Sequence, residues 1–79
     1  MGTIRSVIPL EGYRLLIELN TGSSITVDLL PKLKTARFAE LADQKVFQDV
    51  KTDRETVIWG DGVLKIPVFE MIDVAVGGM

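Results

Sequence analysis

The side chains available for chemistry in this 79-residue sequence are chiefly carboxylates, hydroxyls, amines and a single indole, because histidine and cysteine are both absent. Without histidine the chain lacks the commonest general base and metal ligand, and without cysteine it has no thiolate nucleophile, disulfide or Cys-based metal site. Tyr13, Asp28 and Trp59 remain as candidates for a small pocket. Asp28 would be an acid at the end of an apolar strand, and Trp59 would be a platform for a flat ligand.

Each of these candidates also has an ordinary structural role. An aspartate at a strand end commonly accepts hydrogen bonds from the following turn, and a tryptophan in a small domain commonly packs in the core. No second carboxylate stands at a spacing that would pair it with Asp28, and the acidic residues do not follow the pattern of a calcium-binding loop. We therefore predict no catalytic residues, no metal ligands and no cofactor.

Charge and composition narrow the classes of partner. Nine basic residues against eleven acidic ones give a net charge of −2 and a pI near 4.9. Because nucleic-acid binding depends mainly on a basic surface, this balance argues against a nucleic-acid partner. No stretch has the length and character of a membrane span or a signal peptide, so a cytoplasmic protein without membrane contact is expected.

The apolar content is high for so short a chain, since 47% of the residues are hydrophobic and the mean hydropathy is +0.28. A domain of this size buries only about 60% of the surface that its unfolded chain exposes. Small domains without disulfides or metals commonly gain stability by association. We therefore predict that some apolar surface is shared with another copy of the chain, as a homo-oligomer, or with a small protein partner.

One domain spanning residues 1–79 is expected to position these side chains, with an ordered core at 3–76 and a frayed tail at 77–79. The patterns below predict an α+β fold. Its antiparallel sheet consists of a three-stranded N-terminal meander and a C-terminal hairpin, and one short helix packs on this sheet. The last segment of the chain is either a C-terminal helix or a further strand.

Three strands are predicted in the first part of the chain from residues that alternate between apolar and polar. They cover residues 3–10, 13–20 and 24–29, with glycine-containing turns between them. Leu16 is the exception in the second strand, because it is an apolar residue on the polar side. The inward side of the third strand is predicted to consist of Ile25, Val27 and Leu29.

The middle of the chain is predicted to leave the sheet and form a helix. Thr35 is a suitable N-cap for a short helix at 36–43. The apolar side of this helix, which would pack on the sheet, consists of Phe38, Leu41 and Ala42.

The sheet is expected to resume with a fourth strand at 46–51. A hairpin follows, in which strands 55–59 and 63–66 flank Gly60-Asp61-Gly62. The Asp-Gly pair favours a type I′ turn, which needs positive φ at both central residues.

The segment at 67–76 fits both a helix and a strand. Proline at its start and Gly77 after its end are typical of a helix, whereas its β-branched residues favour a strand, and we prefer a helix through about Asp73. In either form the segment is apolar on more than one side, which suits a partner-binding surface. The predicted interface consists of Val68, Phe69, Met71, Ile72, Val74 and Val76. The alternative is that the segment closes one end of the core.

Several short motifs follow one another in an order that resembles a known family. They are Val-Ile-Pro-Leu at 7–10, Tyr13, the Asn-Thr-Gly turn at 20–22, Val-Asp-Leu at 27–29, Phe38 with Leu41, Phe47, and Trp59 followed by Asp61-Gly62. Together they resemble the bacterial family catalogued as domain of unknown function 2442, over roughly residues 3–69.

The resemblance implies a small α+β domain with an antiparallel sheet, and the family has no established catalytic residues to transfer. It also implies a gene that often lies beside the gene of another small protein, which suggests the antitoxin-like member of a toxin–antitoxin pair. Some relatives carry a helix-turn-helix domain after this one. Gly60 departs from the family, in which a proline often follows the tryptophan.

Three functions follow as hypotheses. A non-catalytic protein-interaction module, self-associating or bound to a partner, is preferred because of the apolar excess and the family context. One alternative is a small-metabolite-binding or small enzyme domain that uses Tyr13, Asp28 and Trp59. The other is a nucleic-acid-associated regulator, by analogy with the relatives that carry a DNA-binding domain.

Overall fold

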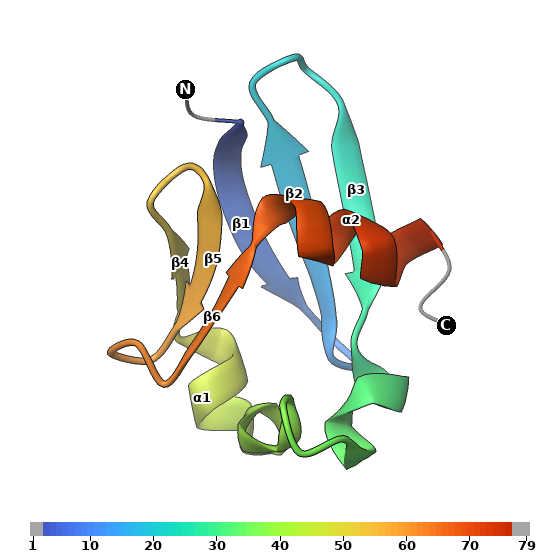
Figure 1. The fold of residues 1–79 in the computed structure, drawn as a ribbon, viewed down its shortest axis with the longest axis vertical. Helices are drawn as coiled ribbons and strands as arrows, with labels where there is room; N and C mark the ends of the chain where they lie inside the picture. The colour runs from blue at the N-terminus through green and yellow to red at the C-terminus, as the bar shows by residue number, and fades with distance from the viewer. Residues whose placement is uncertain (1–2, 77–79) are drawn as a thin grey trace.

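Six strands form two three-stranded antiparallel sheets in the computed structural model, which describes residues 3–76 of the chain. Figure 1 shows the helix α2 (Val68–Val76) crossing in front of the first sheet, with the second sheet beside it and the short helices at one end. The predicted α+β class, N-terminal meander and C-terminal hairpin are confirmed. The tail at 77–79 lies outside the described residues. None of the helices within 3–76 is long and apolar enough to cross a membrane.

The first sheet is a meander in which β1 (Ile4–Leu10), β2 (Arg14–Leu19) and β3 (Ser24–Asp28) are neighbours in sequence order. In the central strand Leu15 and Ile17 are fully buried, so the residues between and beside them point to the opposite face. The predicted alternation is therefore confirmed. The predicted inward side of the third strand is also buried or half-buried, and it consists of Ile25, Val27 and Leu29.

The second sheet consists of β4 (Val50–Thr52), β5 (Thr56–Trp59) and β6 (Leu64–Pro67). The turn between β4 and β5 joins this sheet to the first one. The Arg54 carbonyl accepts hydrogen bonds of 2.9 and 2.8 Å from the backbone N–H groups of residue 3 and Ile4. The two sheets are thus connected where β1 begins.

The hairpin of β5 and β6 forms as the sequence predicts, with Trp59 paired to Leu64, but its turn is different from the prediction. A type I′ turn at Asp61 and Gly62 would need positive φ at both residues. Positive φ occurs instead at Gly60 (+61°) and Gly62 (+95°), and Asp61 keeps a negative φ. The left-handed conformations thus fall on the two glycines, which adopt them without the steric penalty that an aspartate would have. The resulting loop is longer than the predicted turn.

The middle of the chain corrects the prediction of one helix at 36–43. Two short 3-10 helices, η1 (Leu30–Lys34) and η2 (Ala39–Ala42), are present instead. Thr35 ends η1 and does not begin a helix, because its backbone N–H and its hydroxyl both donate to the Lys32 carbonyl, at 2.9 and 2.7 Å. The Thr35 side chain is thereby turned back toward η1, and no helix begins directly after it.

The strand predicted at 46–51 is wrong in its first part, which belongs to the helix α1 (Gln44–Gln48). Asp43 begins this helix, since its Oδ1 accepts a hydrogen bond of 2.9 Å from the Lys45 N–H in the manner of an N-cap. Phe47 is buried from within the helix. Only the last part of the predicted strand is extended, as part of β4.

A single core joins the meander, the hairpin, α2 and the short helices. Two of the residues predicted for the apolar helix side, Phe38 and Leu41, are buried in it, whereas Ala42 is exposed. The largest side chain in the core is that of Trp59. The buried apolar residues are Ile4, Leu15, Ile17, Val27, Leu29, Phe38, Leu41, Phe47, Val57, Trp59, Ile66 and Met71.

The turn between β4 and β5 is held by Asp53, which is exposed. Its Oδ1 accepts hydrogen bonds from the backbone N–H groups of Glu55, at 3.0 Å, and Thr56, at 2.8 Å. These bonds favour the ionised carboxylate and lower the pKa of Asp53 below its ordinary value of 3.8.

Asp53→Asn is expected to be less stable than the wild type at neutral pH. It should also lose less stability than the wild type does when the pH is lowered. The stabilisation from the ionised side chain is present above the pKa of the unfolded chain and is lost as the pH falls through the lower pKa of the folded chain. The difference in unfolding free energy between wild type and Asp53→Asn, measured by urea denaturation, should therefore shrink between about pH 5 and about pH 2.

Asp61→Asn is the control for this prediction, because it removes the same charge from another exposed turn. At neutral pH, Asp53→Asn should lose more stability than Asp61→Asn does. A difference between wild type and Asp53→Asn that stays constant as the pH falls would contradict the role assigned to Asp53.

Candidate functional site

The segment predicted as the interface forms the helix α2, and the helix divides the predicted residues between two sides. Met71 is fully buried in the core, and Val68 and Val74 are half-buried against it. These residues attach the helix to the domain, as the alternative interpretation of the segment required. The side chain of Val76 lies outside the described part of the chain.

The other side of α2 faces outward. Phe69 is 68% exposed, which is the largest exposure among the bulky apolar residues described. Ile72, which is half-buried, and Asp73, which is exposed, follow it by three and four positions and so lie on the same side of the helix. Phe69, Ile72 and Asp73 are named the α2 surface below.

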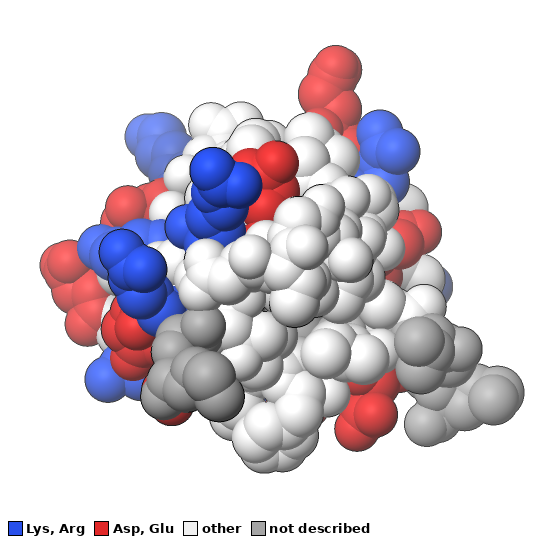
Figure 2. All heavy atoms as spheres, turned by 90° about the horizontal axis from the view of Figure 1, so that it is seen from above, with Lys and Arg blue, Asp and Glu red and all other residues white. Residues whose placement is uncertain are grey.

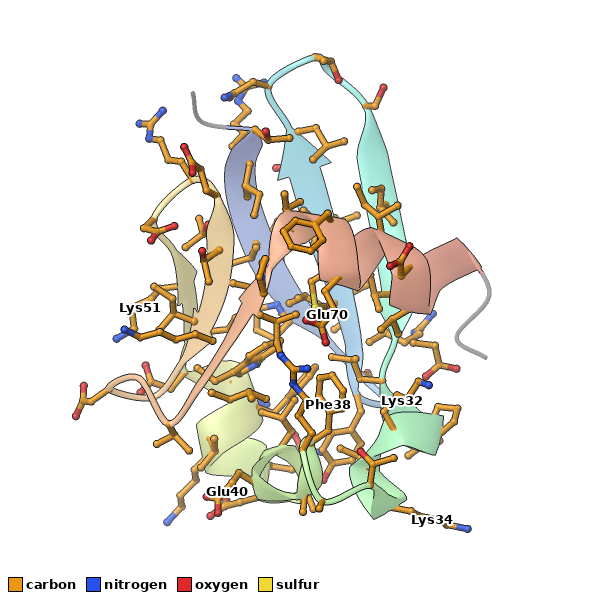
Figure 3. The ribbon with its side chains drawn as sticks, in the orientation of Figure 1. Lys32, Lys34, Phe38, Glu40, Lys51 and Glu70 are labelled. Atoms are coloured by element: carbon orange, nitrogen blue, oxygen red, sulfur yellow. The ribbon has the colours of Figure 1, made fainter. Side chains whose placement is uncertain are left out.

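An ion pair fixes α2 to the segment between η1 and η2. The Arg37 guanidinium contacts the Glu70 carboxylate twice, with Nη1 2.7 Å from Oε2 and Nη2 donating to Oε1 at 3.0 Å. Figure 3 shows Glu70 pointing from α2 toward the segment that carries Phe38. Because both side chains are partly exposed, the pair contributes at most about 1 kcal/mol, but its two-point geometry restricts rotation of the helix.

The residues predicted to form a pocket have different surroundings. Trp59 is fully buried, and its indole Nε1 has no hydrogen-bond partner among the described residues. Tyr13 is half-buried, and its ring meets Phe47 edge-on with the ring centroids 5.3 Å apart. The Tyr13 hydroxyl donates a hydrogen bond of 2.6 Å to the Ala42 carbonyl. Both aromatic residues therefore serve the packing of the core and of the short helices.

Asp28 is exposed at the end of β3, where its Oδ1 accepts a hydrogen bond of 3.1 Å from the Leu30 N–H. This contact is the turn-stabilising role considered for a strand-end aspartate. Within residues 3–76 no cavity brings Asp28 together with Tyr13 and Trp59 around a ligand. The same part of the chain has no group of three acidic side chains placed to hold a metal ion.

Charged side chains are mixed in sign on the face shown in Figure 2, where acidic and basic residues surround an uncharged centre. The lysines labelled in Figure 3 come from distant elements. Lys32 and Lys34 belong to η1, and Lys51 belongs to β4 on the opposite side of the view. On the face shown, the cations are interspersed with acidic side chains.

A second exposed apolar surface was not predicted from the sequence. Ile8 of β1 is 41% exposed and pairs with Leu16 of β2, which pairs in turn with Thr26 of β3. The three side chains form a row across the outer face of the meander, which is the face turned away from the core. In the sequence, Leu16 indicates this surface because it is an apolar residue on the polar side of its strand. Its neighbours across the sheet, however, are known only from the register of the three strands.

Comparisons with known proteins place the chain in a family. No curated protein and no solved structure matches it. A model of the family described as "Protein of unknown function (DUF2442)" matches residues 4–67, from the first residue of β1 to the last residue of β6. The match includes both sheets and the short helices between them, and it ends where α2 begins. Because the matched region covers most of the chain, the protein belongs to the DUF2442 family.

Proposed function

We propose that this chain is a non-catalytic protein-interaction module that binds a small protein partner through the α2 surface. The observation that carries the proposal is the 68% exposure of Phe69 on a helix whose other side is anchored by the fully buried Met71. Aromatic residues presented by a rigid element are typical of the few positions that contribute most of the free energy of binding.

The α2 surface is also formed before any partner binds. The buried Met71 and the two-point contact between Arg37 and Glu70 fix the helix, so little conformational entropy would be lost on binding. A complementary partner would offer an apolar pocket for Phe69 and a basic side chain near Asp73, at the edge of that pocket.

We further propose that the partner is the small protein encoded beside this gene, and that this chain is the antitoxin-like member of the pair. The family resemblance supports this proposal, because relatives are often encoded next to a second small protein. The location of Phe69 supports it as well, since a stable complex between two small proteins needs an apolar anchor at its centre.

Titration of the purified neighbouring protein with this chain in a calorimeter tests the proposal. Phe69→Ala is expected to raise the Kd at least about tenfold. Val63→Ala is the matched control, because Val63 is also exposed (53%) but lies in the loop between β5 and β6. The control should change the Kd by no more than about twofold. No binding by the wild-type chain, or equal effects of the two substitutions, would contradict the proposal.

The antitoxin-like role is tested in cells with the same two variants. Expression of the neighbouring protein alone is expected to arrest growth. The wild-type chain and Val63→Ala should restore growth, whereas Phe69→Ala should not. Tight binding without any effect on growth would support the proposed interaction but contradict the antitoxin-like role.

A further inference from the structure

We propose that two copies of this chain associate through the outer face of the meander, with β2 of one copy packed antiparallel across β2 of the other. The inference rests on the proposed interaction function and names a surface for self-association that is separate from the α2 surface. Three cross-strand rows form this face: Ser6, Glu18 and Ser24; Ile8, Leu16 and Thr26; and Leu10, Arg14 and Asp28.

The outer face is open and apolar at its centre. Ile8 is 41% exposed, Leu16 beside it is half-buried, and Arg14 and Thr26 are exposed. Figure 1 shows that α2 and β6 lie on the opposite side of the sheet. A central apolar row with a polar and charged border is the composition of a protein–protein interface, and its burial would be favourable.

The charges on β2 select a second copy in one orientation. Arg14 and Glu18 lie two residues before and two residues after Leu16, on the same face of the strand. A two-fold axis between the copies and perpendicular to the strands reverses the direction of β2. Leu16 then faces Leu16, and Arg14 of each copy faces Glu18 of the other. Parallel strands would instead place like charges opposite each other, which is unfavourable.

Both charged side chains are held in place within one copy. The Ser6 hydroxyl donates a hydrogen bond of 2.6 Å to Glu18 Oε1, which leaves Oε2 available to a second donor. The Arg14 Nε donates to the Glu11 carbonyl at 3.1 Å, so its terminal nitrogens are the groups that extend further. Side chains that are ordered before association lose less entropy when they pair.

The size of the face predicts a weak dimer. Six residues of β2 extend about 20 Å and three strands span about 15 Å, which gives roughly 300 Å² on each copy. A standard interface buries about 800 Å² per partner. Packed sheets also cross at about 30°, so the contacts near Leu16 on the central strand are kept while the outer strands diverge. The face is well below this size, so a weak equilibrium is expected, in which dimers form only toward protein concentrations of about 1 mM.

Sedimentation equilibrium at low salt, up to about 1 mM protein, tests this proposal with charge-reversal variants. The wild-type chain should dimerise. Arg14→Glu and Glu18→Arg should each weaken the dimer at least about tenfold, because each creates two like-charge contacts. The double variant Arg14→Glu/Glu18→Arg should recover the affinity to within about threefold. Circular dichroism of each variant shows that the fold is kept.

Two results would overturn the proposal: a wild-type chain that is monomeric at every concentration, and a double variant that is as weak as the single ones. A dimer that Phe69→Ala dissociates and Leu16→Lys does not would also overturn it, because self-association would then use the α2 surface. Binding to the neighbouring protein is measured separately with Phe69→Ala, so failure of the dimer and failure of the partner interaction are distinguishable.

Discussion

Trp59→Ala is expected to lower the free energy of unfolding by about 3–5 kcal/mol, which is the usual cost of truncating a buried tryptophan. Trp59 is the largest fully buried side chain of the domain. A domain of 79 residues is stable by only about 4–12 kcal/mol in total. The substitution should therefore remove a large fraction of the total stability of the domain. Urea denaturation followed by far-UV circular dichroism measures the loss, because the variant has no tryptophan fluorescence.

Trp59→Phe is the matched variant for this experiment. It keeps an aromatic ring in the core and removes the indole N–H, which has no hydrogen-bond partner among the described residues. Removal of an unpaired buried donor offsets part of the lost packing, so a smaller cost of about 1–2 kcal/mol is expected. Equal losses for the two variants would mean that the volume of this side chain is not central to the core.

The sheets could be predicted from the sequence because their signals are local. The alternation around Leu15 and Ile17 identifies the buried face of β2 without reference to any other part of the chain. The glycines of the β5–β6 loop likewise indicate a turn, although the choice between a two-residue and a longer turn depends on φ at Asp61. Local patterns therefore predict that a turn exists better than they predict its type.

The short helices could not be predicted in this way. A helix of five residues, such as α1, gains little from its own sequence and forms because it packs. Val46 favours a strand by its branching, but the hydrogen bond from the Lys45 N–H to Asp43 starts a helix. Such a cap contributes at most about 2 kcal/mol, so the packing of Phe47 in the core decides between the two outcomes.

The candidate surfaces depend on distant contacts, which explains why they were predicted only in part. The sequence assigned six apolar residues of α2 alike to an interface, including Met71 and Phe69. The division between these two follows from the position of the helix on the core. That position is influenced by the pair of Arg37 and Glu70, which are 33 residues apart in sequence. The row that includes Leu16 depends in the same way on the register of three strands.

A matched pair of substitutions measures the orientation of α2 directly. Met71→Ala should lower the free energy of unfolding by about 2–5 kcal/mol, because it leaves a cavity in the core. Phe69→Ala should change it by no more than about 0.5 kcal/mol, because its ring is mostly in water. Alanine is favourable in a helix at both positions, so differences in helix propensity cannot produce this contrast. Urea denaturation followed by the fluorescence of Trp59 gives both values.

The contrast between these two variants also bears on function. If Phe69→Ala were as destabilising as Met71→Ala, Phe69 would be part of the core, and the α2 surface would lose its central residue. If instead Phe69→Ala leaves stability unchanged while it weakens binding to the neighbouring protein, the exposed ring contributes to recognition and not to folding. An exposed aromatic ring that contributes nothing to folding would then be explained by a partner that covers it.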